Sequence, residues 1–181
     1  MTGLDIALRL VVAACATAGI SLLVFPLVDE GRLEDERQAE TLVCGLDVLT
    51  PQLRDASLRV AFETDLPPAA VAALLQRFPA DVYGLNYDTG NSAALGYNPL
   101  EEVRALSGRI YNVHIKDRRR WGPSVPLGMG DADLPTAIRL LREAGYAGNY
   151  ILQTARAPDG DHAGALTRAR DLLLSWLEPV R

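Results

Sequence analysis

The sequence contains few of the residues on which several protein classes depend. Among 181 residues there are two cysteines, Cys15 and Cys44, and two histidines. The cysteines have neither the spacing of a zinc cluster nor the density of a disulfide framework. We therefore expect free thiols and a reducing, cytoplasmic location.

Positive charge is also scarce. Lys and Arg number 18 against 23 Asp and Glu, a net charge of −5. Since nucleic-acid binding depends on clustered Lys and Arg, we predict no nucleic-acid partner. The one basic cluster, Lys116 with Arg118, Arg119 and Arg120, is short. It predicts either a segment that holds a substrate phosphate or carboxylate, or a solvated loop after a strand.

Long apolar runs are limited to one, the uncharged 19 residues from Leu10 to Val28. This run meets the length of a membrane span, and VAAC at Val12–Cys15 looks like a lipoprotein cleavage box. However, Asp5 and Arg9 precede it, and Gly19 followed by SLLVFPLV is typical of a helix end and a buried strand. We predict no membrane partner; a membrane-anchored protein is the alternative, to be tested by fractionation.

The rest of the chain alternates between strand and helix patterns. The expected helices are 5–18, 33–55 (ended or kinked by Pro51), 67–78, 99–106, 134–144 and 162–177, and the expected strands are 21–28, 58–63, 82–88, 110–115 and 149–154. We expect a loop rich in Gly, Asn and Ser after residue 88, and a long polar loop over 117–133.

This alternation predicts an α/β fold with about five parallel strands, right-handed crossovers and flanking helices. Without linkers or low-complexity tracts, residues 1–181 form one expected domain. A closed eight-stranded barrel typically needs about 250 residues, more than this chain has. A doubly wound open sheet is the alternative; it predicts a glycine-rich turn after the first strand, where FPLVDEGRLED offers one glycine.

Three metal-capable side chains follow successive expected strands. Glu63 lies in AFETD, Asp88 follows YGLNY, and His114 lies in YNVHIKD. The carboxyl ends of parallel strands meet at one edge, and this oxygen, oxygen and nitrogen set suits Mn, Mg, Co or Zn. Taken singly, such an acid is more often a helix cap or a loop acceptor than a metal ligand. Together the three predict a divalent metal site.

The motifs AFETD, NYDTGNSA, NVHIKDR with PLGMGDAD, and YILQTAR resemble the last five βα units of the xylose-isomerase-like TIM barrels. This is the sugar-phosphate isomerase/epimerase group related to apurinic endonucleases, and the resemblance runs from about residue 4 to 177. It implies an incomplete TIM barrel that is the C-terminal part of that fold.

The resemblance also implies a ligand set and a reaction. Matching by motif gives Glu63, Asp88, His114 and Gln153 as metal ligands, with Gln153 standing where the family has a carboxylate. The implied activity is isomerisation or epimerisation of a sugar or sugar phosphate through an enediolate, with Glu63 as the catalytic base. Since an amide cannot take a proton, a non-catalytic carbohydrate-binding or scaffold descendant is the alternative.

Other positions are implied to contact substrate. Asn91 stands in DTGN where the family has a histidine, and Lys116, Arg118 and Arg156 follow the last two strands, where barrels often hold phosphate. Salt bridges around the rim explain these cations equally well. The loop with Gly128, Gly130 and Asp131 is either a cover over substrate or a tight turn. For His162 we expect a surface or capping role, which makes a three-metal DNA-repair site improbable.

The resemblance implies that three strands of a complete barrel are absent. Unpaired edges at 21–28 and 149–154 would then favour association. We expect either a truncated product or partner chains that cover the opening, and hence a homo-oligomer.

Overall fold

The computed structural model describes residues 3–178. The chain divides into two compact units, Met1–Leu85 and Asn86–Arg181, each of which is described by itself below.

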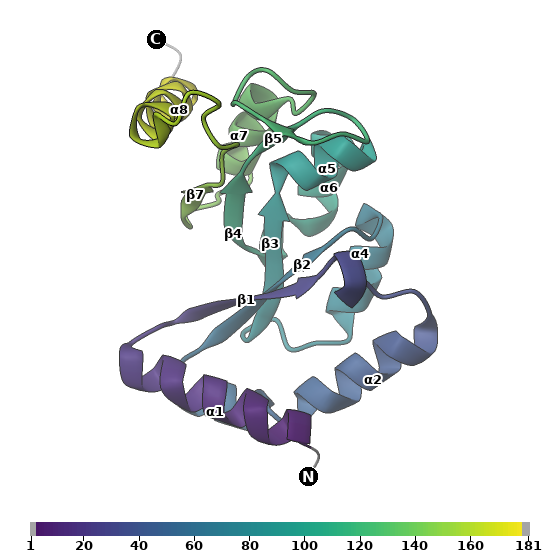
Figure 1. The fold of residues 1–181 in the computed structure, drawn as a ribbon. Helices are drawn as coiled ribbons and strands as arrows, with labels where there is room; N and C mark the ends of the chain where they lie inside the picture. The colour runs from purple at the N-terminus through teal and green to yellow at the C-terminus, as the bar shows by residue number, and fades with distance from the viewer. Residues whose placement is uncertain (1–2, 179–181) are drawn as a thin grey trace. The chain divides into compact units, whose positions relative to one another are not determined.

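The first unit contains α1 (Gly3–Ala18), β1 (Leu22–Leu27), η1 (Asp29–Gly31), α2 (Glu36–Asp47), α3 (Thr50–Asp55), β2 (Arg59–Thr64), α4 (Pro68–Gln76) and the start of β3 (Tyr83–Asp88). The second contains the end of β3, α5 (Thr89–Leu95), α6 (Pro99–Leu106), η2 (Ser107–Arg109), β4 (Ile110–Ile115), β5 (Asp117–Arg118), β6 (Ser124–Val125), α7 (Leu134–Glu143), β7 (Tyr150–Leu152) and α8 (His162–Leu177) (Figure 1).

The main sheet is parallel, with the strand order β1-β2-β3-β4-β7. Phe25 pairs with Phe62, Phe62 pairs with Leu85, and Val113 pairs with Tyr150. Within residues 3–178 the order begins at β1 and ends at β7, so the barrel is not closed. The predicted α/β class, five parallel strands with flanking helices, is confirmed.

Aromatic packing holds the first unit together. Phe62 of β2 lies 5.8 Å from Tyr83 in a stacked arrangement and 5.1 Å from Phe78, measured between ring centroids. Tyr83 is fully buried, and its hydroxyl donates a 2.8 Å hydrogen bond to the carbonyl of Leu46. This bond satisfies the polar end of a buried ring and ties α2 to the sheet.

Aliphatic side chains form the core of the second unit. Val113 and Ile115 of β4 are completely buried, as are Ile138 and Leu141 of α7. Helix α7 contacts both α6 and α8. Its apolar residues recur at helical spacing, which is why the sequence predicted it well.

The long apolar run at Leu10–Val28 is divided between two elements. Helix α1 ends at Ala18, Gly19 adopts a left-handed φ of +69°, and the amide of Ile20 donates to the carbonyl of Cys15. This is a glycine-terminated helix end, as the sequence predicted. In the part of the chain that the structure describes, no helix has the length and apolar character to cross a membrane.

Two local predictions were wrong. The expected helix over 33–55 is interrupted after Asp47, and Pro51 lies in the first turn of α3, where its missing N–H breaks no helical bond. The expected loop after Asp88 begins with α5, because Asp88 caps this helix at one end and Gly96, with a φ of +78°, closes it at the other.

The long loop over 117–133 is more ordered than the sequence indicated. β5 and β6 pair in antiparallel fashion within it, with Asp117 opposite Val125. The buried carboxylate of Asp117, 1% exposed, accepts hydrogen bonds from the amides of Gly128, Gly130 and Ala132. A Cβ at Gly130 would lie 2.0 Å from that carboxylate, so glycine is required there.

Candidate metal centre

The site begins where β3 turns directly into α5. Asp88 ends the strand and is also the N-cap of the helix: its Oδ1 accepts from the amides of Gly90 at 2.9 Å and Asn91 at 2.8 Å. These bonds satisfy two N–H groups that the first helical turn leaves unpaired. They also fix the carboxylate, which is 4% exposed, so that Oδ2 faces β4.

Thr89 and Gly90 attach this turn to β4. The Thr89 hydroxyl donates a 2.7 Å hydrogen bond to the carbonyl of Lys116 and accepts a 3.0 Å hydrogen bond from the backbone N–H of the same residue. Gly90 leaves room for the Lys116 stem, since a Cβ there would lie 2.6 Å from Lys116 Cγ. Each residue of the Asp-Thr-Gly sequence therefore has its own structural role. Asp88 caps α5, Thr89 attaches the turn to the end of β4, and Gly90 leaves space for the side chain of Lys116.

The second carboxylate oxygen of Asp88, Oδ2, faces two basic groups. His114 Nδ1 lies 3.9 Å from Asp88 Oδ2, and Lys116 Nζ lies 3.5 Å from the same oxygen. The side chains of His114 and Lys116 are 14% and 16% exposed. Little water therefore reaches these three side chains.

Two asparagines on neighbouring strands orient the histidine. Asn112 donates a 2.7 Å hydrogen bond to Oδ1 of Asn86, and the Asn86 amide nitrogen lies 3.1 Å from His114 Nδ1. This contact holds the imidazole ring in place, and the neutral form of such a ring is the one that can bind a metal.

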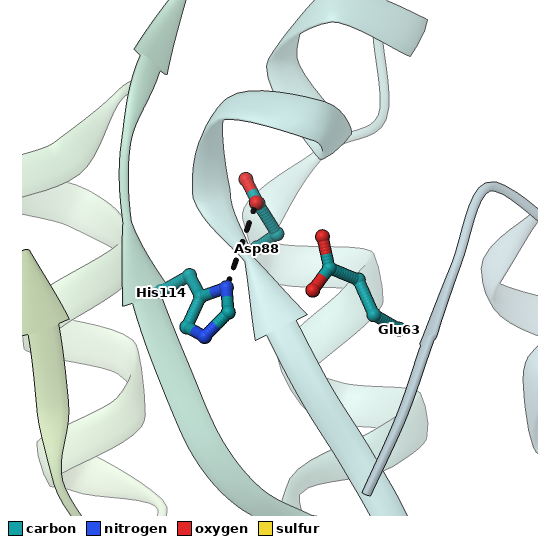
Figure 2. A group of neighbouring side chains, drawn as sticks. All are labelled: Glu63, Asp88 and His114. Carbon is teal, nitrogen blue, oxygen red and sulfur yellow. Dashed lines mark ion pairs between the residues drawn. The ribbon is translucent and has the colours of Figure 1, made fainter. Parts of the chain in front are cut away.

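Glu63 completes a group of three. It lies near the end of β2, directly after Phe62, whose register partner is Leu85. Figure 2 shows Glu63, Asp88 and His114 as neighbouring side chains; each offers a ligand atom, and these atoms lie within 4.8 Å of one another. Two carboxylate oxygens and an imidazole nitrogen at such separations suit a small divalent cation.

The other residues predicted for the site have different surroundings. Asn91 Oδ1 accepts from Lys116 Nζ at 3.3 Å and from Arg118 at 2.9 Å, so these three side chains form one cluster. Gln153 is exposed, and its backbone N–H donates to the carbonyl of Ile115. Arg156 is exposed in the loop that follows β7.

A buried acid near α6 was missed by the sequence reasoning. Glu102, 5% exposed, accepts from the Tyr87 hydroxyl at 3.0 Å and from the Ser92 hydroxyl at 2.6 Å. Burial raises the pKa of Glu102, although both hydroxyls oppose the rise. Burial, followed by the charge of Glu102, raises the pKa of Tyr87 well above its ordinary value. Tyr87, Ser92 and Glu102 line a cavity of about 220 Å³.

The chain belongs to the xylose isomerase-like TIM barrel family, whose model matches residues 7–177. The predicted family is thereby confirmed. A curated relative is L-ribulose-5-phosphate 3-epimerase of Escherichia coli, which is 32% identical over 85 residues. That match covers 46% of this chain and 30% of the relative, so the aligned part is less than a third of the relative's length.

Solved structures show the same fold. A xylose isomerase domain protein from Planctomyces limnophilus superimposes with a TM-score of 0.82 at 20% identity, covering 95% of this chain and 65% of the other. The IOLI protein, solved with a bound zinc atom, gives a TM-score of 0.77 at 19% identity, covering 93% and 68%. At these identities the likeness concerns the fold.

Proposed function

We propose that this chain is part of a metal-dependent isomerase or epimerase that acts on a ketose or ketose phosphate. The observation that carries the proposal is the grouping of Glu63, Asp88 and His114, with ligand atoms within 4.8 Å of one another. Family membership and a relative named as an L-ribulose-5-phosphate 3-epimerase support the substrate class.

In this proposal Asp88 and His114 hold the ion, with Glu63 as a third ligand and Gln153 as a fourth through its amide oxygen. A bound divalent ion would polarise the substrate carbonyl and the neighbouring hydroxyl. Glu63 removes the proton from the carbon beside the carbonyl and returns it to the former carbonyl carbon, a one-base isomerisation with an enediolate between the two steps. Epimerisation would need a second proton donor on the opposite face of the enediolate. Asp88 stays anchored to α5 through Oδ1, so only Oδ2 is available to the ion.

The cations beside the site are proposed to bind substrate. Lys116 and Arg118 both contact Asn91, and together they present two positive charges at the end of β4. A substrate phosphate suits these donors, with Arg156 as a further candidate. If so, L-ribulose 5-phosphate binds more tightly than unphosphorylated L-ribulose, and Arg118→Met removes most of that preference while leaving the metal content unchanged.

Proton exchange tests the reaction directly. The protein, loaded with Mn²⁺, is incubated with L-ribulose 5-phosphate in D₂O, and NMR follows deuterium entry at the carbon next to the carbonyl. We expect incorporation by the wild type and none by Glu63→Gln, with circular dichroism showing that the variant is folded. Incorporation at the wild-type rate by Glu63→Gln would refute the assignment of the base.

A non-catalytic sugar-binding protein is a second candidate, favoured by the glutamine at position 153. An amide cannot transfer a proton, so the second acid/base group of a two-base epimerisation is lacking at that position. Metal analysis separates the candidates: stoichiometric metal whose removal by chelator abolishes proton exchange supports the enzyme. Metal-free protein that still binds L-ribulose supports the binding protein.

A further inference from the structure

A cavity of about 340 Å³ lies between the loop that follows β7, helix α8 and the segment Pro126–Leu127. Its walls are mainly apolar. Leu127 is buried, and Ala165, Ala169 and Leu172 face the space from α8. This volume is at the lower end of the range for small-molecule sites, and apolar walls of this kind favour an apolar body over a sugar, whose hydroxyls would lack partners.

Two arginine side chains bring positive charge to this apolar cavity. Arg156 and Arg168 both line it. Within residues 3–178, Arg156 makes neither a hydrogen bond nor an ion pair. Arg168 is held only loosely, with its NH1 3.6 Å from Asp161 Oδ2 and both side chains more than half exposed. Two guanidinium groups therefore line the cavity, one of them loosely paired with Asp161, and one carboxylate, Asp159, also lines it.

The loop that carries Arg156 is ordered by its own hydrogen bonds. The amide of Ala157 donates a 3.2 Å hydrogen bond to Nδ1 of His162, an exposed residue at the start of α8, and this bond ties the loop to the helix. Asp161 Oδ1 accepts from the amide of Gly164 and so caps α8. These bonds order the loop beside the cavity, which reduces the ordering that binding requires.

We propose that this cavity binds a small organic anion, an apolar body such as a phenyl ring that carries a phosphate or carboxylate group. The apolar body lies against Ala165, Ala169 and Leu172, and the anionic group pairs with Arg156 and Arg168. The proposal goes beyond the sugar chemistry proposed above and does not depend on the metal site. It assigns Arg156 to this cavity in place of the substrate phosphate, which is left to Lys116 and Arg118.

Binding of phenyl phosphate tests this proposal, with inorganic phosphate and phenol as the two halves of the probe. Ligand-observed NMR titrations are run on the whole chain in EDTA, so that metal chemistry plays no part. We expect phenyl phosphate to bind saturably below about 10 mM and at least about tenfold more tightly than either half, since both the charge and the apolar body contribute.

Two variants locate the site. Arg156→Met removes a guanidinium group, and Ala165→Leu fills the cavity from an exposed helix where leucine is well tolerated. Each should weaken phenyl phosphate binding by about tenfold or more. Arg170→Met is the matched control, because Arg170 lies on the same helix but pairs with Asp171 outside the cavity. It should bind like the wild type.

The proposal is overturned by any of three results: no saturable binding, equal affinity for phenyl phosphate and inorganic phosphate, or unchanged binding in both Arg156→Met and Ala165→Leu. Since the titrations contain EDTA, failure here leaves the metal-dependent function untouched. Conversely, loss of proton exchange in Glu63→Gln has no bearing on this cavity.

Discussion

At the residue scale, Glu102 is a carboxylic acid with two hydroxyl donors and almost no contact with water. Its folded-state pKa is raised, so folding favours the protonated form. The resulting stabilisation is fully present below the unfolded pKa of about 4.3 and is lost as the pH rises through the folded pKa.

The prediction concerns Glu102→Gln, which keeps the shape but does not ionise. We expect the unfolding free energy of wild type to fall relative to that of the variant as the pH rises from about 4 through the folded pKa of Glu102. Urea denaturation at a series of pH values measures this difference. Glu101→Gln is the control, because its carboxyl is on the exposed face of the same helix. A parallel pH dependence in wild type and Glu102→Gln would show that this acid is not linked to folding.

At the scale of elements, the turn from β3 to α5 depends on the absence of a side chain at Gly90. Gly90→Ala would place a Cβ 2.6 Å from Lys116 Cγ, so Lys116 must move away from Asp88. We expect destabilisation by about 1–3 kcal/mol, as for other overpacked sites. Chemical denaturation measures it.

Gly45→Ala is the matched control, since Gly45 lies in α2 with nothing within 4 Å of a built Cβ. It should stabilise the chain by about 0.4–1 kcal/mol through helix propensity and the unfolded state. If the unfolding free energy falls in Gly90→Ala and rises in Gly45→Ala, packing against Lys116 determines the effect of Gly90→Ala. The same sign for both would mean that Lys116 can rearrange freely.

The segment around Gly90 also shows how far the sequence could predict the structure. Apolar runs identified all five strands of the sheet, and the metal-capable residues were found because each lies near a strand end. Helix α5 was missed because Gly90, Asn91 and Ser92 have low helix propensity. What overrides propensity there is the cap from Asp88 and the left-handed Gly96.

Pairings between distant residues were beyond the reach of the sequence. Tyr87 and Glu102 are 15 positions apart, on a strand and a helix, and no local pattern joins them. The signal that could have indicated a buried acid was Glu102 beside Val103 on the apolar face of α6. Likewise the role of Asp117 depends on amides 11 to 15 residues further on.

The Asp117 loop gives a second prediction at this scale. Asp117→Ala leaves three amides of the loop without their acceptor, and we expect a loss of about 1–3 kcal/mol in unfolding free energy. Hydrogen exchange at 126–132 should rise selectively, which mass spectrometry can follow. Asp131→Asn, at a more exposed carboxylate that accepts one amide, should leave exchange at 126–132 nearly unchanged. Unaltered exchange in Asp117→Ala would mean that β5 and β6 alone order the loop.

At the scale of the whole molecule, a metal bound only by the folded chain must raise its stability. The increase follows RT ln(1 + [L]/Kd), about 2.7 kcal/mol when the free metal is 100 times Kd. We therefore expect the unfolding midpoint of wild type to rise with Mn²⁺ or Zn²⁺ and to return to its starting value on addition of EDTA.

Asp88→Asn and His114→Gln decide whether this gain arises at the proposed centre. Each removes a ligand, so the metal-dependent rise in the unfolding midpoint should largely disappear in both. Asp88→Asn keeps an oxygen that can cap α5, and so separates the loss of metal from the loss of the helix cap. Asp131→Asn changes a residue that is not among the proposed ligands, so this variant should respond to metal as the wild type does. An equal rise in wild type, Asp88→Asn and His114→Gln would place the bound metal elsewhere, and the proposed enzyme would then lack its essential ion.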